Sequence, residues 1–372
     1  MQNPAQTPLA AKLAQRIKAG GPISLRDYMS ACLYDPEFGY YRNVVAIGGA
    51  GDFITAPEIS QIFGESIGLW AGAIWRQMGG PAKIHLVEFG PGRGTLMADA
   101  MRVLKVLPSF LSAVSVHLIE TSKVFRDRQE AALQGFSSAI QWHESLETVP
   151  AGPSIVIANE FLDCFPIRQF IFDEGAAFWR ERLVDIAGDG FAWGIGEAVS
   201  LPVELTLEPS DGSVLEYCPA LAPLMRELAA RSAEFPMAAL FIDYGYDRQS
   251  FGETLQAVRS HRFADVFAAP GETDLTAHVN FDLLRRVAKA EGFSIFGPMP
   301  MGEWLLRLGL EARASQLLKA ASPQEADAIK TGVARLVDPA KMGILFKAAA
   351  FTRGLSETPP PFQAVNKTEL DA

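Results

Sequence analysis

The sequence predicts an α/β protein built on a doubly wound, mostly parallel sheet of about seven strands. Short runs that are apolar on both faces, such as residues 83–90 and 152–161, alternate with helical stretches. Such strands are typical of a parallel sheet that helices cover on both sides. The 372 residues are 49% hydrophobic and 20% charged, ordinary values for a globular protein with a core. That length accommodates one large domain or two ordinary ones.

Residues 1–80 are expected to form an N-terminal helical region with a glycine-rich lid loop. A helix is predicted over 8–19, and a short helix followed by a turn over 24–41. The glycine-rich stretch at 43–58 is longer than most loops, which favours a functional or mobile segment. A helix of about 20 residues follows, by its helical spacing of apolar residues. Its predicted buried face carries Ile67, Trp70, Ala71, Ile74 and Met78.

The main domain is expected over residues 81–353, where strands and helices alternate. Strands are predicted at 83–90, 114–120, 139–142, 152–161 and 237–245, with helices at 95–107, 122–133 and 218–235. Residues 292–297 and 342–351 are expected to be a closing pair of strands. The segment “LPSFLSA” between the first two strands is interpreted as an extra loop.

Three insertions are predicted in this domain. Residues 167–186 alternate and turn at Asp173–Gly175, which indicates a β-hairpin. Residues 246–282 are loop-rich, and residues 301–340 are expected to be helical. The polar, proline-bearing tail at 354–372 is expected to be flexible.

Composition excludes several classes of function. The formal net charge is −10, from 33 Lys and Arg against 43 Asp and Glu, so neither a nucleic-acid footprint nor a polybasic membrane patch is expected. The sequence contains no run of about 18 apolar residues, so no membrane-spanning helix is expected. The three cysteines form no C-x-x-C pair and the five histidines are scattered, so no metal site is predicted.

The strand at 83–90 runs into a glycine-rich loop. Gly90, Gly92 and Gly94 have the spacing G-x-G-x-G, and no lysine follows them, which disfavours a nucleoside-triphosphate loop. A dinucleotide fingerprint has the spacing G-x-G-x-x-G, and Glu88 would be a poor neighbour for its pyrophosphate. The Glu88 carboxylate suits the ammonium group of a methionine moiety, so S-adenosylmethionine is the favoured ligand. The alternative is an ordinary strand-to-helix turn.

Polar residues also follow the next three strands. Glu120 is expected to bind both ribose hydroxyls of the ligand. Trp142, His143 or Glu144 would reach the adenine ring, and Glu144 is included in the predicted cofactor site. The segment after the fourth strand, Asn159–Asp163, is where the reacting group should lie.

The chain resembles a known family over residues 8–353. The motifs that carry the resemblance are “GDFITAPEISQIFGE”, “VEFGPGRGTLM”, “HLIETS”, “ANEFLDCFPIRQF”, “FIDYGY”, “GETDLTAHVNF” and “MGILFK”. They occur in the order typical of the MidA/NDUFAF7-like family, S-adenosyl-L-methionine-dependent protein arginine methyltransferases linked to assembly of respiratory complex I. The resemblance implies a seven-strand Rossmann-like methyltransferase fold with inserted substrate-binding elements. It also implies a target arginine on a 49-kDa-type complex I subunit.

The family's site residues are carried over to matching positions. Glu88, Gly90, Gly92 and Gly94 would take the methionine end of the cofactor, and Glu120 its ribose. Residues 51–58 would lie over the cofactor, with Asp52 and Thr55 in contact with it. Asn159, Glu160 and Asp163 would form the reaction centre.

Methylation of a guanidinium requires carboxylates, because its pKa above about 12 makes it a poor nucleophile. Glu160 and Asp163 are expected to hold it and accept its proton, with Asn159 beside them and Asp243 and Tyr244 as second-rank candidates.

Structural roles are open alternatives for several of these residues. Glu160 or Asp163 would then cap the following helix, and Thr55 with Glu58 would form a capping box around Pro57. The pair Asp274 and His278 either lines the substrate cleft or is simply hydrogen-bonded.

Two other functions remain open on the sequence: a SAM-binding assembly chaperone and a small-molecule methyltransferase. The N-terminus lacks a clear transit peptide, unlike the mitochondrial members, which points to a bacterial relative and a cytoplasmic location.

Overall fold

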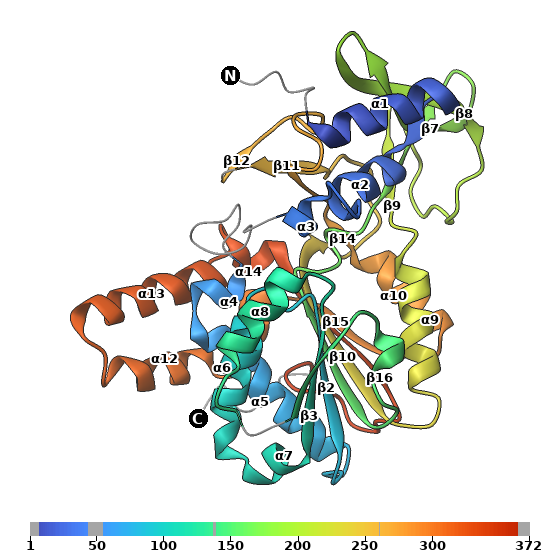
Figure 1. Ribbon diagram of the computed structural model, residues 1–372. Coiled ribbons are helices and arrows are strands. Elements are labelled where there is room, and N and C mark those ends of the chain that lie inside the picture. Colours follow the sequence, from blue (N-terminus) through green and yellow to red (C-terminus); the bar gives the residue numbers. More distant parts are fainter. Residues whose placement is uncertain (1–6, 44–54, 137–138, 260, 364–372) are drawn as a thin grey trace. The chain divides into compact units, whose positions relative to one another are not determined.

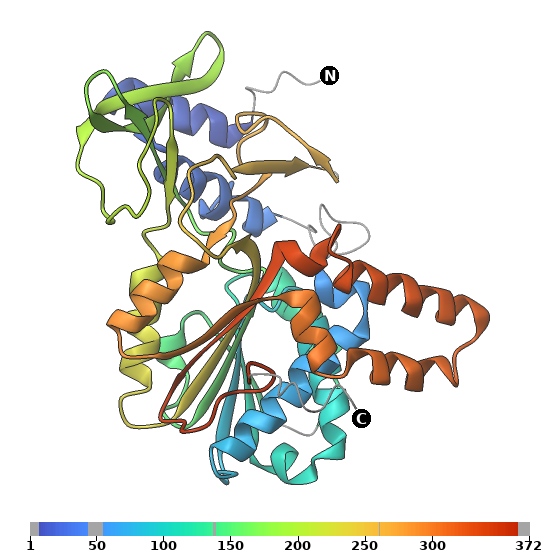
Figure 2. The same ribbon diagram turned by 180° about the vertical axis from the view of Figure 1, so that it is seen from behind.

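The computed structural model describes residues 7–43, 55–136, 139–259 and 261–363, and the chain divides into two compact units. Unit 1 comprises residues 1–54, 162–224 and 246–284, and unit 2 comprises residues 55–161, 225–245 and 285–372. Both units are therefore discontinuous in sequence, and they cut across the boundary at residue 80 that the sequence suggests. Figures 1 and 2 show the elements of each unit.

Unit 2 contains a sheet whose strands follow the order β15-β16-β10-β5-β2-β3-β4, which confirms the predicted sheet of about seven strands. Their bounds are β2 (Ile84–Phe89), β3 (Val114–Ile119), β4 (Ala139–His143), β5 (Ser154–Asn159), β10 (Met237–Tyr246), β15 (Ser294–Pro300) and β16 (Phe346–Arg353). The first five of these strands are mutually parallel where they pair. Strand β16 runs antiparallel to both β10 and β15, so the expected closing pair is confirmed. Residues 342–345, predicted as strand, form the short helix α14 (Met342–Leu345) instead.

Helices cover both faces of this sheet. One face carries α5 (Gln61–Gln77), α6 (Thr95–Val103), α7 (Pro108–Ala113) and α8 (Lys123–Ala132). In Figures 1 and 2, α9 (Leu221–Arg231) and α10 (Phe281–Ala290) lie on the other side of the strands from α5 and α6. The interpretation of “LPSFLSA” as a loop is wrong, because these residues form α7, with Pro108 in its first turn.

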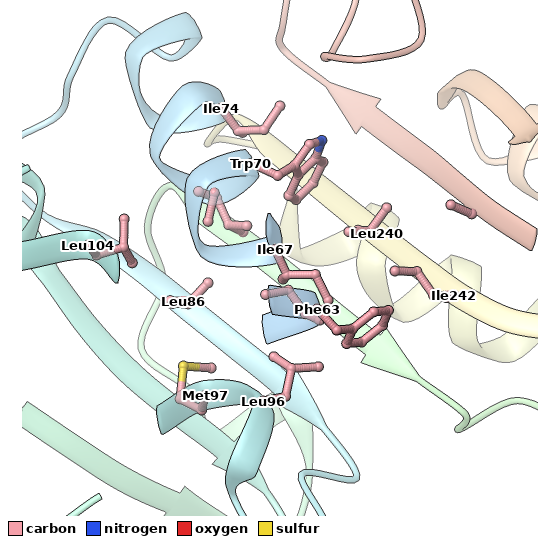
Figure 3. Close-up of a cluster of buried hydrophobic side chains, with 14 of the residues drawn as sticks. Phe63, Ile67, Trp70, Ile74, Leu86, Leu96, Met97, Leu104, Leu240 and Ile242 are labelled. Atoms are coloured by element: carbon pink, nitrogen blue, oxygen red, sulfur yellow. The ribbon is translucent and has the colours of Figure 1, made fainter. Parts of the chain in front are cut away.

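The core of unit 2 lies between α5, α6 and the sheet. Figure 3 shows Phe63, Ile67 and Trp70 of α5 directed toward Leu240 and Ile242 of β10. Each of these side chains is fully buried. Burying a side chain of this size stabilises the fold by roughly 1.5–3 kcal/mol. The predicted apolar face of α5 is confirmed, with Met78 only partly buried at its end.

Three further helices of unit 2 occupy the insertion at 301–340, as predicted: α11 (Met301–Arg307), α12 (Leu310–Leu318) and α13 (Pro323–Val337). The capping box of Ser322 and Glu325 begins α13. Arg313 of α12 binds both carboxylate oxygens of the buried Glu65 on α5, at 2.7 and 3.0 Å. Arg102 of α6 reaches the same carboxylate at 3.4 Å. This ion cluster attaches the inserted helix α12 to α5 and α6.

A chain of hydrogen-bonded histidines crosses three strands of the same sheet. His85 Nδ1 lies 2.9 Å from His117 Nε2, and His117 Nδ1 lies 2.9 Å from His143 Nε2. His143 Nδ1 ends the chain 2.8 Å from the hydroxyl of Thr148. Burial lowers the pKa of all three rings, and that of His117 falls to about 3. The three histidines are therefore neutral near pH 7.

Unit 1 contains a five-stranded sheet of order β1-β7-β6-β9, with β8 paired to β7. The strands are β1 (Ile23–Ser24), β6 (Arg168–Asp173), β7 (Phe178–Ala187), β8 (Gly190–Val199) and β9 (Val214–Tyr217). The predicted hairpin at 167–186 is thus confirmed as β6 and β7, while β8 was not predicted. A smaller sheet contains β11 (Gln256–Arg259), β12 (Arg262–Phe263) and β13 (Asp274–Thr276), and β14 (Val279–Asn280) precedes α10.

Helices α1 (Pro8–Gly20) and α2 (Leu25–Tyr34) pack against the sheet of unit 1, and α3 (Tyr40–Asn43) follows them. Both predicted helices are confirmed, and the side chains of Thr7 and Ser24 cap their N-termini. Leu9, Leu13 and Ile17 are buried on one face of α1, as their spacing indicates. Among the described helices, none combines the length and apolar character that crossing a membrane requires.

Candidate functional site

The carboxyl ends of β2, β3, β4 and β5 meet at one edge of the sheet in unit 2. The pairing places Phe89 beside both Ile119 and Ala158, and Ile119 beside His143. The polar residues predicted after each strand therefore lie along a single edge. Ligands of open α/β sheets bind at this edge.

The glycine loop after β2 has a backbone that other residues adopt only with strain. Gly90, Gly92 and Gly94 have φ angles of 59°, 53° and 81°. A side chain at such angles costs roughly 1–2 kcal/mol for each residue. Gly94 precedes the first residue of α6, so the loop leads directly into a helix N-terminus. The predicted strand, glycine loop and helix are all present.

Glu88 fits a cationic ligand group. The residue is only 3% exposed, and its Oε2 has no hydrogen-bond partner among the described residues. Burial raises the pKa of this carboxyl to about 8. A buried carboxyl without a partner destabilises the protein unless another group satisfies it. An ammonium group, which has three donors and no acceptor, would do so.

Asn159 at the end of β5 adds a second unsatisfied acceptor. Its Oδ1 is buried and has no hydrogen-bond partner among the described residues, while its Nδ2 donates to Glu160 at 3.2 Å. Asn159 lies on the same face of the sheet as Glu88, because each stands two residues after a core residue of its strand, Ile157 and Leu86. Two acceptor oxygens on one face match the ammonium end of a methionine moiety.

Glu120 is half-buried just beyond β3. Its carboxylate accepts hydrogen bonds from the backbone of Ser122 at 2.7 Å and from Gln129 at 3.3 Å. Burial raises the pKa of Glu120, and these two hydrogen bonds oppose that effect. The carbonyl oxygen of Glu120 accepts from Arg126.

The three candidates for adenine contact differ in their surroundings. The Trp142 indole donates to Gln129 Oε1 at 2.8 Å, and His143 belongs to the histidine chain. The Glu144 side chain is 81% exposed, with Arg126 at 3.9 Å. Of the three, Trp142 is the residue that hydrogen-bonds to the buried Gln129, which also hydrogen-bonds to Glu120.

Glu160 occupies a strained position after β5, with a φ of 48°. Its Oε1 accepts a hydrogen bond from the backbone N–H of Ala56 at 3.0 Å, at the first turn of α4 (Ala56–Ile59). Glu160 therefore contacts an earlier helix of unit 2 rather than capping a following one. Strained residues of this kind concentrate at functional sites.

The capping-box interpretation of Thr55 and Glu58 is wrong. Thr55 stands at the N-cap position of α4 and Pro57 is in the first turn, but the Thr55 side chain makes no capping bond. The Glu58 carboxylate instead accepts from the Thr95 hydroxyl at 2.5 Å and pairs with Arg93 at 3.3 Å. Since Arg93 lies in the glycine loop, α4 is held against that loop. Asp52 and the rest of 51–54 lie outside the described residues.

Asp243 supports the segment after β5. Its Oδ2 accepts from the backbone N–H of Phe161 at 3.1 Å, and its Oδ1 from that of Tyr244 at 2.9 Å. Phe161 in turn stacks on Phe89, with ring centroids 5.2 Å apart. Asp243 therefore helps to shape the backbone beside Glu160.

Asp163 belongs to unit 1, on the other side of the unit boundary between residues 161 and 162. Asp163 and Asp274 are both buried. The negative charges of both carboxylates add to burial in raising the pKa of the Tyr41 hydroxyl well above its usual range, so both lie close to that hydroxyl. Tyr41 donates to Asp274 at 3.4 Å. Nearby, Tyr34 donates to the carbonyl oxygen of Cys164 at 2.9 Å. Unit 1 thus groups two carboxylates and two tyrosines.

His278 follows Ala277, whose backbone N–H donates to the carbonyl oxygen of Asp163 at 2.9 Å. The backbone N–H of His278 donates to the Thr254 hydroxyl at 2.9 Å, and its ring nitrogen lies 3.3 Å from Gln256 Nε2. The residue lines a small pocket of unit 1 together with Glu216 and Tyr246. Burial lowers the pKa of His278, which makes it a neutral polar group.

Comparison with known proteins identifies the family of the chain and its cofactor. Residues 66–299 match a family described as “Putative S-adenosyl-L-methionine-dependent methyltransferase”. The chain is 37% identical to the protein arginine methyltransferase NDUFAF7 homologue of Drosophila melanogaster, covering 93% of this chain and 85% of that one. It is 35% identical to human NDUFAF7, covering 93% and 83%.

The chain belongs to the NDUFAF7 family of S-adenosylmethionine-dependent methyltransferases. A Burkholderia thailandensis protein solved with bound S-adenosyl-homocysteine has the same fold. The TM-score is 0.80 at 28% identity, covering 94% of this chain and 93% of that one. These similarities confirm the Rossmann-like fold and S-adenosyl-L-methionine as the cofactor.

The expected cytoplasmic location is wrong. The names of the fly and human NDUFAF7 relatives both describe mitochondrial proteins. The expectation was drawn from the lack of a clear transit peptide at the N-terminus, and that pattern does not outweigh relatives similar over nine-tenths of the chain.

Neither Gln129 nor the contact of Glu58 with Thr95 is predicted by the sequence. Gln129 sits four residues after Phe125, so both fall on one face of α8, and both are buried. A polar residue in phase with the apolar face of a helix was the available signal. No sequence pattern indicated that Glu58 would contact Thr95, which is 37 residues away.

Proposed function

We propose that this member of the NDUFAF7 family methylates an arginine of a protein, and that the target is a 49-kDa-type subunit of respiratory complex I. The observation that carries the arginine assignment is the similarity to relatives named protein arginine methyltransferases, at 35–37% identity over nine-tenths of the chain. The name of those relatives, together with the family resemblance, supports complex I as the context.

Unit 2 would hold the cofactor. Glu88 and Asn159 would take the ammonium group, because each has a buried oxygen without a partner among the described residues. The backbone of Gly90–Gly94 would line the methionine end, Glu120 would bind the ribose, and Trp142, more than the exposed Glu144, would face the adenine. Thr55 would lie near the cofactor because it stands at the start of α4, which contacts the glycine loop through Glu58 and Arg93. Asp52 is kept in the proposed site from the resemblance alone.

The bound cofactor supplies an electrophilic methyl group, and the chain has to prepare the nucleophile. Glu160 would pair with the substrate guanidinium, which localises its positive charge away from the attacking nitrogen. Asp163 is kept as a second carboxylate of the reaction centre from the resemblance alone. One of these carboxylates would accept the proton that this nitrogen loses. Asn159 would orient the Glu160 carboxylate, to which it already donates.

The test uses the full chain, labelled cofactor and the purified complex I subunit. Mass spectrometry should locate the label on an arginine, and Asp163→Asn should lower the rate by at least about a hundredfold. Asp189→Asn is the matched control, because it makes the same change at an exposed carboxylate of unit 1 and should leave the rate unchanged.

Other outcomes would point elsewhere. Label on a small molecule from a cell extract, and none on protein, would contradict the protein substrate. Full complex I assembly in cells carrying Asp163→Asn, with methylation lost, would favour a chaperone role. Label on another protein's arginine would overturn only the subunit assignment.

A further inference from the structure

One buried amide in unit 2 joins the three segments that form the edge of the cofactor site. Gln129, in the middle of α8, is 0% exposed, although most of that helix is polar. A primary amide taken out of water destabilises the fold unless its donors and acceptor are satisfied.

The amide of Gln129 bonds to groups at the carboxyl ends of three different strands. Its Nε2 donates to the carbonyl oxygen of Gly92 at 2.7 Å and to the Glu120 carboxylate at 3.3 Å. Its Oε1 accepts from the Trp142 indole at 2.8 Å. The glycine loop, the end of β3 and the end of β4 are thus tied to one side chain.

The orientation of this amide is fixed by its partners. The carbonyl of Gly92 and the carboxylate of Glu120 accept hydrogen bonds, whereas an indole N–H only donates. A flipped amide would place its NH₂ group against the indole N–H and its oxygen against two acceptors. Only one orientation satisfies all three contacts, so the amide also fixes the positions of its partners.

The backbone of the glycine loop packs against the same residue. A Cβ at Gly94 would lie 3.2 Å from the Cα of Gln129, which is closer than ordinary contacts. The loop therefore approaches α8 more closely than a residue with a Cβ atom would allow without a small shift.

We propose that Gln129 is a positioning residue for the adenosine end of the cofactor, acting through Glu120 and Trp142. This inference rests on the proposed function of those two residues in binding ribose and adenine. Gln129 itself would not touch the reacting methyl group. Its loss should therefore weaken cofactor binding and leave the rate at saturating cofactor unchanged.

The test measures the affinity of the full chain for three probes by calorimetry: S-adenosylhomocysteine, adenosine and methionine. Gln129→Met keeps the length of the side chain and removes every hydrogen bond. Affinity for adenosine should fall by about fivefold to tenfold, from the loss of roughly one net hydrogen bond, and affinity for S-adenosylhomocysteine by at least as much. Methionine affinity should fall less than adenosine affinity, because Gly92 is the one Gln129 partner at the methionine end. Gln134→Met is the matched control, because Gln134 is an exposed glutamine just beyond the same helix.

Two more variants separate the possible outcomes. Trp142→Phe removes the indole donor and part of the aromatic surface, so it should lower adenosine affinity and preserve methionine binding. If Gln129→Met does not fold, Gln129→Glu replaces it, since a carboxylate still accepts from Trp142 but repels Glu120. Adenosine affinity of Gln129→Glu should then fall further as pH rises.

The results that would overturn the proposal are specific. Unchanged adenosine affinity in Gln129→Met, with a loss in Glu120→Gln, would reject the role of Gln129 alone. Unchanged affinity in both variants would reject the adenosine assignment itself. A lower rate at saturating cofactor with unchanged KM would mean that Gln129 acts at the reaction centre and not at the adenosine end.

Discussion

The Glu160 carboxylate at the end of β5 accepts the backbone N–H of Ala56 at the start of α4, at 3.0 Å. Helix α4 is also joined to the glycine loop by Glu58 and Arg93. The residue proposed to bind the substrate guanidinium thus also holds a helix of unit 2. The two roles are separable by substitution.

Glu160→Gln should preserve the capping of α4 and impair methyl transfer. The amide oxygen of glutamine still accepts the Ala56 N–H, but it carries no charge to pair with a guanidinium. We expect the rate to fall at least about a hundredfold. Glu160→Ala should additionally loosen α4, at a stability cost of about 1 kcal/mol. Hydrogen exchange of residues 56–59 reports the second effect, and wild-type methylation by Glu160→Gln would show that Glu160 only caps.

Glu88 should make the ligand-free protein less stable as pH rises. Its folded pKa of about 8 lies above the ordinary 4.5, so between these values the folded state binds more protons than the unfolded state. Stability is then lost as pH increases through this window, by up to about 1.4 kcal/mol per pH unit. Urea unfolding at several pH values measures the slope. Glu88→Gln should flatten it, and an identical slope in both proteins would contradict the assignment.

Cofactor affinity should show the opposite pH dependence. Pairing with an ammonium group requires the ionised form of Glu88, so binding releases a proton wherever the free carboxyl is protonated. Affinity for S-adenosylhomocysteine should therefore increase between about pH 6 and about pH 7.5, by up to tenfold per unit. Calorimetry in two buffers of different ionisation enthalpy counts the proton. Glu88→Gln should bind more weakly and without this dependence.

His117 should destabilise the protein in acid. Its folded pKa of about 3 lies below the ordinary 6.5, so the unfolded state binds the extra proton in that window. Stability should fall as pH decreases from 6.5, by up to about 1.4 kcal/mol per unit. His117→Gln keeps a donor and an acceptor for His85 and His143 but does not titrate, so its slope should be shallower. His261→Gln, at an exposed position, is the control that should match the wild type.

Arg313→Met should destabilise unit 2 more than Glu65→Met does. Removing the arginine leaves the buried Glu65 carboxylate with the longer Arg102 contact at 3.4 Å and a hydrogen bond from the neutral Gln61 at 3.2 Å. Removing Glu65 instead leaves two arginines that water reaches. We expect a loss of about 1–3 kcal/mol for Arg313→Met. Urea unfolding of the two single variants gives the ranking, and a larger loss in Glu65→Met would reverse this interpretation.

The elements that the sequence predicts well are those with a strong local signal. The both-face apolar strands, the face of α5 and the loop Gly90–Gly94 are recognisable within windows of a few residues. Glu88 stood out because a carboxylate ended an otherwise apolar strand. The structure adds that one of its oxygens is buried and unpaired among the described residues.

The features that were not predicted depend on partners distant in sequence. The contact of Glu160 with Ala56 spans 104 residues, and that of Glu58 with Thr95 spans 37. The side chain of Glu58 had a local alternative, the capping box, which the tertiary contacts replaced. Strand β8 was missed because Gly194 and Gly196 interrupt its apolar residues.

The interleaving of the two units constrains the order in which the nascent chain can fold. Strand β1 pairs with β7, so Ile23 meets Val184 only after some 160 further residues have been synthesised. Until then the apolar face of α1 has no sheet to pack against. Unit 2 likewise waits for β16, the last strand of its sheet. Unit 1 therefore completes its core only once residues 246–284 have been made, and unit 2 only once β16 has been made, so the apolar faces of the emerging N-terminal helices stay exposed during that interval.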